Sequence, residues 1–421
     1  MIERQTRTLS FAPIESTATA AVLKTSNITN EIMAREPGSE CNHFAAFRKT
    51  VRPVLARGPS LEAMFRRSFQ TMSLSLDKQL TLGCPMKVAL FSWTSHEITL
   101  AGTNAEYGKA NPFQELHVEQ AWQKFVEGLP ILVGGVFPGI FARKSVEGRE
   151  CLVQGFLRYF QDDHHLTEGS GAVLARLKHN TAAGMPLTDT ARGEVGACMA
   201  LLNNTIPGVF WLIYHIYSDP VVLRDLRHEL LANAVRIDGV SGTHTIDIAR
   251  VRSACAVLQS TMQEVFRFRG IGTGMVRSVL EDQTLDGQYL LKKGSLLFAP
   301  NNVQHFNPEL WGPNCDQFDH RRFLRSAGGS TVSKSPSALR IFGGGATYCP
   351  GRHFASGQLL IFAAMVALRA DIRPVKGLEW GDIKAEKSFG LGIATGFLMP
   401  DNELEVEISS SGDQTWRMEL P

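Results

Sequence analysis

The sequence predicts a mainly α-helical protein with small β-sheets, an α+β fold. Apolar residues at helical spacing recur along most of the chain, whereas β-like stretches are confined to about residues 275–299 and 388–408. No linker rich in proline, glycine or serine and no internal repeat divides the 421 residues. Residues 1–58 are hard to assign, so we expect an ill-defined N-terminal segment over 1–58 and one large domain over 59–421.

The composition is that of a globular protein with a large core, because 44% of the residues are hydrophobic and 20% are charged. Lysine and arginine number 43 against 41 acidic residues, which gives no sign of a nucleic-acid partner. Seven scattered cysteines without a C-x-x-C pair fit a reducing, intracellular compartment. The longest apolar stretch, Leu129 to Ala142, is interrupted by glycine and proline and is shorter than the roughly 20 residues of a spanning helix, so no spanning helix is expected.

The predicted helices follow in order. Ser60–Leu76 has helical apolar spacing and carries the basic pair Arg66-Arg67, and residues 114–128 and 145–161 form two more helices. Asp189-Thr190 can cap a helix that runs to about Ser218 and that is apolar on nearly every side, so this helix is expected to be buried. Pro207 should kink it by removing one hydrogen bond, which leaves a polar notch at Asn204 and Thr205.

The C-terminal half continues the helical pattern. Asp219-Pro220 ends the long helix and begins the next one. Residues 253–268 form a helix on which Glu264 and Arg267, three residues apart, share a face. Arg277 follows in a β-like run, and the last long helix extends from Pro350 to about Ala370.

Cys349 stands in the most informative run of the chain, Phe342-Gly-Gly-Gly-Ala-Thr-Tyr-Cys-Pro-Gly-Arg352. The glycines allow backbone N–H groups to approach an acceptor closely, and the N-terminus of the helix that follows favours a thiolate over a thiol. Such a cysteine suits a soft metal, and heme iron with a proximal thiolate is one known use. An isolated cysteine is more often a small buried hydrophobe, so the residue by itself leaves both interpretations open.

Taken together, the motifs resemble those of the cytochrome P450 family. Phe342, Gly345, Cys349 and Gly351 stand in the places of the family's heme-binding loop. Glu264 and Arg267 resemble the Glu-x-x-Arg pair of helix K, Phe318–Leu324 resembles the meander with Arg322 as its arginine, and Asn203–Thr205 occupies the oxygen-activation place of helix I. The residues of these motifs are most similar to those of the branch of cholesterol 7α-hydroxylase, prostacyclin synthase and their fungal relatives. The resemblance covers about residue 60 to the end of the chain.

The resemblance implies a cytochrome P450 fold that holds heme b through the Cys349 thiolate, with Phe342, Gly345 and Gly351 around it. It further implies heme-propionate binding by Arg277 and Arg66, oxygen activation by Thr205 and Asn204, and a structural charge network of Glu264, Arg267 and Arg322. Two positions depart from most relatives: Thr347 replaces a propionate-binding arginine, and Asn204 replaces an acidic residue. The implied pocket walls are Leu201, Leu202, Gly270–Gly274 and Leu391–Thr395.

The implied activity is that of a monooxygenase that oxidises a hydrophobic small molecule of sterol, terpenoid, polyketide or alkaloid type in secondary metabolism. It would use O2 and electrons from NADPH-cytochrome P450 reductase. Two alternatives stay open: an isomerase or dehydratase that acts on a peroxide, and an inactive heme-binding remnant. The family's membrane anchor and first elements are expected to be absent, which implies a cytoplasmic location or peripheral attachment to the endoplasmic reticulum.

Overall fold

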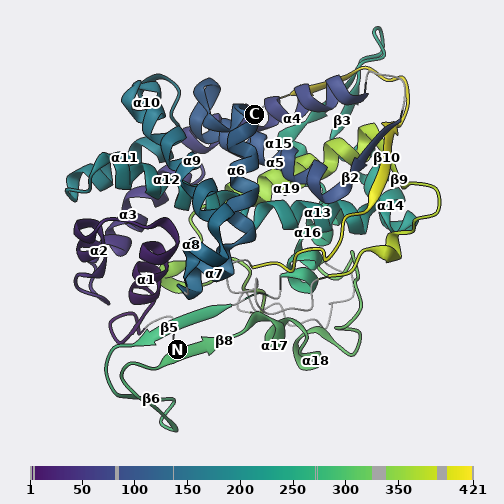
Figure 1. Ribbon diagram of the computed structural model, residues 1–421. Coiled ribbons are helices and arrows are strands. Elements are labelled where there is room, and N and C mark those ends of the chain that lie inside the picture. The colour runs from purple at the N-terminus through teal and green to yellow at the C-terminus, as the bar shows by residue number, and fades with distance from the viewer. Residues whose placement is uncertain are drawn as a thin grey trace.

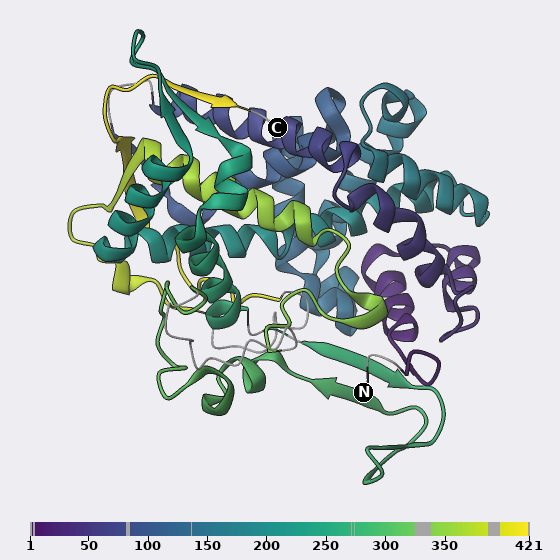
Figure 2. The same cartoon turned by 180° about the vertical axis from the view of Figure 1, so that it is seen from behind.

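The computed structural model describes residues 2, 5–80, 85–135, 137–270, 272, 274–324, 338–385 and 396–419. A body of packed helices carries small sheets at its margins, which confirms the predicted fold class (Figures 1 and 2). Residues 386–395 lie outside the described residues. Two predictions fall on them: the pocket wall Leu391–Thr395 and the beginning of the 388–408 β-rich segment.

The N-terminal residues, which the sequence left unassigned, form three helices beside α11 and α12 (Figure 1). In chain order the elements are β1 (Leu9–Ser10), α1 (Ala12–Leu23), α2 (Asn27–Ala34) and α3 (His43–Leu55). The carboxylate of Asp189 accepts hydrogen bonds from the hydroxyls of Ser26 and Thr29, both at 2.5 Å. The capping role predicted for Asp189 is therefore wrong: α12 begins at Leu187, and Asp189 fastens α2 to α12.

The helical body follows. Its first part comprises α4 (Pro59–Leu80), α5 (Leu90–Tyr107), α6 (Leu116–Glu127), α7 (Leu129–Gly134), α8 (Pro138–Phe141), α9 (Arg143–Gln161), α10 (His164–Thr167) and α11 (Gly171–Ala182). Its second part comprises α12 (Leu187–Leu202), α13 (Thr205–Tyr217), α14 (Pro220–Asn233), α15 (Ile248–Ala254), α16 (Ala256–Arg269), α17 (Asn301–His305), α18 (Pro308–Trp311) and α19 (Arg352–Arg369). Asp219 caps α14 by accepting a hydrogen bond from the Val221 N–H, as the sequence predicted.

The long apolar helix predicted up to Ser218 is interrupted at Asn203 and Asn204, where α12 ends and α13 begins. Pro207 lies in the first turn of α13, where a proline is tolerated because that turn has no intrahelical partner for its N–H. The hydroxyl of Thr205 donates to the Leu201 carbonyl at 2.7 Å across the break. The polar notch expected from the sequence is therefore a junction between two helices.

The central core is formed where α13 and α19 pack against each other, with α5 against α13 and α4 against α19. Nearly every side chain of α13 is buried, and Trp211 donates to the Leu398 carbonyl at 2.7 Å. Gly357 of α19 allows a close approach to α4, because a Cβ at this position would lie 2.4 Å from the Phe65 ring. The helix that follows the cysteine loop is thereby held against the core.

Three small sheets and a hairpin surround the helices. Their strands are β2 (Met86–Ala89), β3 (Val235–Ile237), β4 (His244–Asp247), β5 (Met275–Val279), β6 (Gln283–Leu285), β7 (Tyr289–Leu291), β8 (Leu296–Ala299), β9 (Ala370–Pro374), β10 (Glu405–Ser410) and β11 (Trp416–Glu419). The orders are β1-β5-β8, β2-β10-β9 and β11-β4-β3, and β6 pairs with β7. The first of these sheets matters for the site, because its antiparallel register, Leu9 opposite Val279, places the N-terminal segment next to Arg277.

One helical stretch among the described residues, Leu187–Tyr217, is long and apolar enough to cross a membrane by length and composition alone. Of its most apolar window, 67% is buried inside the protein, as is usual for a core helix, so this is weak evidence for a membrane span.

Gly357→Ala tests the packing of α19 on α4. The added methyl group would overlap the ring of Phe65, which is fully buried, so we expect a loss of about 1–3 kcal/mol in the free energy of unfolding, measured by urea titration. Gly139→Ala on α8 is the control, since a Cβ there meets nothing within 4 Å. Equal stability of the two variants would contradict the close contact.

Candidate functional site

The cysteine loop, residues 342–351, is a compact turn that ends directly before α19. The Cys349 N–H donates to the Phe342 carbonyl at 3.0 Å, which closes the loop on itself. Gly343 and Gly345 have φ values of +71° and +61°, a region that side-chain-bearing residues rarely adopt. The glycine run therefore serves the turn, and Gly351 is the N-cap of α19.

The thiol of Cys349 is half-buried, and two opposing effects act on its pKa. Burial raises the pKa and is the larger effect, whereas the backbone N–H groups of Gly351 and Arg352 and the charge of Arg352 lower it. The N–H groups at the start of α19 favour the thiolate as the sequence predicted, but burial outweighs them, so the net pKa is raised. A cationic metal at the sulfur would supply the missing stabilisation of the thiolate.

Below the loop lies a charge network that is almost completely shielded from solvent. Both carboxylate oxygens of Glu264 accept hydrogen bonds from Arg267, at 2.8 and 2.7 Å, and Arg322 donates its Nε–H to the same carboxylate at 3.0 Å. The side chains of Glu264 and Arg267 are 0% exposed, and that of Arg322 is 2% exposed. The structure thus brings together the three residues that the sequence placed in one network.

Two arginines share one carboxylate, so the second positive charge needs other partners. Carbonyl oxygens supply them: those of His305, Cys315 and Gln317 accept from Arg267, and those of Trp311, Asn314 and Gln317 accept from Arg322. The network therefore fixes residues 305–322 against α16. It also reaches the cysteine loop, because the Arg340 N–H donates to the His305 ring at 3.3 Å.

Within the part of the chain that the structure describes, a larger and a smaller cavity border the cysteine loop. The larger, here called the loop cavity, has a volume of about 600 Å³ and is mainly apolar. Its walls come from α1, α12, β5, β8 and the loop itself, and include Phe11, Ile14, Ala18, Val22, Gly196, Met199, Gly274, Arg277, Leu296, Gly343, Gly344 and Thr347. The smaller, here called the basic cavity, measures about 170 Å³ and shares Phe11, Arg277 and Thr347 with the first.

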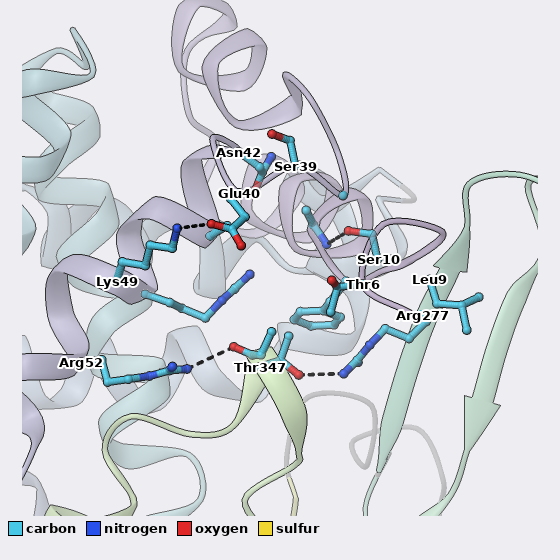
Figure 3. A pocket seen from close by; sticks show the side chains of 16 residues that line it. Thr6, Leu9, Ser10, Ser39, Glu40, Asn42, Lys49, Arg52, Arg277 and Thr347 are labelled. Atoms are coloured by element: carbon cyan, nitrogen blue, oxygen red, sulfur yellow. Dashed lines mark hydrogen bonds and ion pairs between the residues drawn. The ribbon is translucent and has the colours of Figure 1, made fainter. Parts of the chain in front are cut away.

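The basic cavity gathers cations from two elements that are far apart in sequence (Figure 3). Arg277 comes from β5 and donates to the Thr347 hydroxyl at 2.7 Å. Arg52 comes from α3 and donates to the Ala346 carbonyl at 3.2 Å, and Arg48 and Lys49 of the same helix also line the cavity. Thr347 therefore contacts an arginine from another element.

Other predicted residues lie elsewhere. Arg66 is exposed on α4, outside the lining of either cavity; its neighbour Arg67 donates to the Glu168 carbonyl. Leu201 and Leu202, expected as pocket walls, pack against Gly102 of α5. Asn204 accepts a hydrogen bond from the Gly396 N–H at 2.5 Å, which joins the helix junction to the segment after residue 395.

The sequence prediction missed the wall that α1 contributes. Phe11, Ile14, Ala18 and Val22 recur at helical spacing and face the loop cavity. That spacing was the available signal, but the polar, serine- and threonine-rich surroundings obscured it. Arg48 and Arg52 on α3 were missed for a similar reason, since a basic pair on α4 had the same local appearance.

The residues present fit a flat, largely apolar macrocycle with anionic side groups. The loop cavity is lined by Gly343 and Gly344 of the loop and by Gly196 and Met199 of α12, and the adjoining basic cavity offers four cationic side chains. A half-buried cysteine with a raised pKa lies in the same loop and would take a cationic metal as its partner. Fold and site thus define a heme-thiolate class of protein.

Comparisons with known proteins agree with a heme-thiolate class of protein. The sequence model of the family "Cytochrome P450" matches residues 178–396, just over half of the chain. A cytochrome P450 monooxygenase, nodJ, of Hypoxylon pulicicidum is 36% identical over 78% of this chain and 64% of its own length. A cytochrome P450 monooxygenase of Gibberella zeae is 29% identical over 75% of this chain and 61% of its own length.

The chain belongs to the cytochrome P450 family. Cytochrome P450 7A1 of Sus scrofa is also similar, with 25% identity over 68% of this chain and 57% of its own length. The solved structure of retinoic acid-bound cyanobacterial CYP120A1 covers 97% of this chain with a TM-score of 0.74 and 16% identity, which shows the shared fold. The chain spans about three fifths of the length of these curated relatives. The family and the fold imply a heme cofactor with a cysteine thiolate as iron ligand.

Glu264→Gln tests the buried network. Both arginines would keep their charges in a buried place without a carboxylate, so we expect a loss of about 3–5 kcal/mol in the free energy of unfolding, measured by urea titration. Glu62→Gln is the matched control, because its pair with Arg252 at 3.3 Å is partly exposed and contributes below about 1 kcal/mol. A Glu264→Gln variant as stable as the control would contradict the network's role.

Proposed function

We propose that this chain is a heme-thiolate monooxygenase that oxidises a hydrophobic small molecule. The observation that carries the proposal is the position of the cysteine loop, which borders an apolar cavity that continues into a basic one. When bound, a thiolate-ligated heme supplies reductive cleavage of O2: two electrons and two protons are consumed, one oxygen atom enters the substrate and the other leaves as water. Two relatives with the printed name cytochrome P450 monooxygenase support this activity.

The residues around the loop hold the cofactor in this proposal. Cys349 is the iron ligand, and Phe342, Gly345 and Gly351 shape the loop that presents it. Phe342 packs edge-to-face on Phe266 at 5.4 Å, which anchors the loop to α16. Arg277 binds one propionate, and the cations of α3, Arg48 and Arg52, take the place that the sequence prediction gave to Arg66.

Thr205 and Asn204 act at the junction between α12 and α13. The hydroxyl of Thr205 donates its proton to the Leu201 carbonyl, so its oxygen can accept a hydrogen bond from water and hold that water in place. The amide of Asn204 cannot titrate, and its oxygen is engaged by the Gly396 N–H. Proton delivery is therefore assigned to Thr205 with ordered water, and Asn204 keeps the junction open.

The partners are an NADPH-dependent cytochrome P450 reductase, O2 and the substrate. A relative from Gibberella moniliformis, named bifunctional cytochrome P450/NADPH--P450 reductase, supports the reductase, since it joins both activities in one chain. The apolar lining of the loop cavity favours a sterol, terpenoid, polyketide or alkaloid substrate, and the fungal relatives favour secondary metabolism. We place the protein inside the cell, in the cytoplasm or peripherally at the endoplasmic reticulum.

Cys349→Ala tests the ligand assignment. The carbon monoxide difference spectrum of the reduced wild-type chain should show the red-shifted Soret band of thiolate-bound ferrous heme, and the variant should lose both this band and all turnover. Cys315→Ala serves as control, because its buried thiol donates to the Phe306 carbonyl away from the loop. A wild-type chain without that band would favour an inactive remnant.

Thr205→Ala tests the proton path. Without the hydroxyl the water is no longer held, so the ratio of product formed to NADPH consumed should fall severalfold while the thiolate spectrum stays unchanged. Thr94→Ala on α5 is the control, since its hydroxyl likewise donates to a helix carbonyl, that of Leu90 at 3.0 Å. Unchanged coupling would reduce Thr205 to a packing role. Turnover of a hydroperoxide without reductase would instead favour the isomerase.

A further inference from the structure

A third cavity lies behind α1, on the side away from the cysteine loop. It measures about 230 Å³ and is enclosed by α1, α2, α3, α11 and α12; we call it the rear cavity. Glu15, Thr19, Leu23 and Gly196 line both the rear cavity and the loop cavity. These four residues therefore form a septum that separates two adjoining spaces.

The septum is thin because α12 has a glycine at the contact. A Cβ at Gly196 would lie 3.0 Å from Leu23 Cδ1, so only the Leu23 side chain closes the space between α1 and α12 at this point. A leucine side chain can change rotamer without movement of the backbone. A molecule in the loop cavity can therefore extend into the rear cavity when Leu23 turns aside.

The lining of the rear cavity is apolar on one side and formed by small residues on the other. Met33, Phe44, Phe47 and Met185 form its apolar part, and Gly193, Gly196, Ala197 and Ala200 of α12 give it depth. Methionine and phenylalanine side chains adapt to the shape of an apolar guest. This composition suits the end of a hydrophobic molecule.

Polar groups in the rear cavity are left without protein partners. The Asn180 side chain is only 6% exposed, and among the described residues neither its amide nor the Thr19 hydroxyl has a hydrogen-bond partner. Glu15 accepts from Arg48 at 2.8 Å through one carboxylate oxygen, and its other oxygen carries no hydrogen bond within the described ranges. An amide that lines the cavity without a protein partner can form a hydrogen bond to a guest, which adds to the guest's affinity.

The charged groups around this cavity have partners within the protein. Arg176 is bound by the carboxylates of Glu106 and Glu194, and Asp189 is occupied by Ser26 and Thr29. His43 contacts His179 at 3.2 Å, and burial lowers the pKa of His43 to about 4, so it carries no charge near neutral pH. A hydroxyl fits the Asn180 amide, because both groups can donate and accept hydrogen bonds.

We propose that the rear cavity is a second compartment of the substrate site and that the substrate is an elongated apolar molecule with a hydroxyl at the end remote from the oxidised position. This inference rests on the proposed function. The rear cavity alone is smaller than the roughly 300–1,000 Å³ of a usual ligand pocket, so it receives part of a molecule whose remainder lies beside the heme in the loop cavity. In this proposal the side-chain amide of Asn180 forms a hydrogen bond with the hydroxyl of the substrate.

The test compares dodecan-1-ol with dodecane, two probes that differ by one terminal hydroxyl. Both are delivered in cyclodextrin to the heme-loaded chain, and binding is measured by isothermal titration calorimetry. We expect the alcohol to bind about tenfold more tightly, which is the effect of one neutral hydrogen bond in a buried place. Asn180→Leu should remove this preference and leave dodecane binding unchanged. Asn27→Leu, at an exposed position of α2, should keep it.

A second variant guards against misfolding of the first. Ala197→Phe fills the rear cavity from α12 and should also abolish the preference for the alcohol. A preference that persists in both variants would mean that water alone occupies the rear cavity and would overturn the inference, as would failure of both probes to bind. The heme spectrum separates this result from the proposed function. A normal thiolate spectrum without preference refutes the compartment alone, and an Asn180-dependent preference without that spectrum supports the compartment and refutes the monooxygenase.

Discussion

The carboxylate of Glu264 is the constraint on which the rest of the site depends. It is fully buried and neutralises one of two buried arginines, and carbonyl oxygens of residues 305–317 solvate the remaining charge. Because a buried charge is tolerated only with partners in fixed geometry, these carbonyls must keep their positions. The ring of His305 accepts a hydrogen bond from the N–H of Arg340, which lies two residues before Phe342 and the cysteine loop. The fixed position of His305 therefore restrains the segment that enters the loop. The buried network thereby helps to position the segment that leads into the cysteine loop.

The second organising feature is the N-terminal segment. Helix α1 separates the loop cavity from the rear cavity, α3 supplies cations to the basic cavity, and β1 pairs with the strand that carries Arg277. The contact between Asp189 and α2 fastens this segment to α12. Residues that were unassignable from local patterns thus form walls of the loop cavity, the basic cavity and the rear cavity.

Local motifs were recoverable from the sequence wherever a few neighbouring residues determine the geometry. The pair Glu264–Arg267 lies on one helical turn, Asp219-Pro220 begins a helix, and the glycines around Cys349 require a tight turn. Other assignments failed because distant segments decide them. Asp189 had the pattern of a helix cap, yet its hydroxyl partners are Ser26 and Thr29 at α2. No local pattern indicated that Arg52 of α3 would contact the cysteine loop.

The sequence by itself determined the family, the cysteine loop and the identity of the buried network, because each is a fixed spacing of particular side chains. Only the tertiary structure decided what surrounds them. The pKa of Cys349 illustrates the difference. The helix N-terminus that lowers this pKa is visible in the sequence, but the burial that raises it by a larger amount comes from segments packed around the loop. Desolvation depends on the complete fold, and so do the walls of the cavities. The residues that suit heme-thiolate chemistry are therefore recognisable from local sequence, whereas the shape of the cavities around them is not.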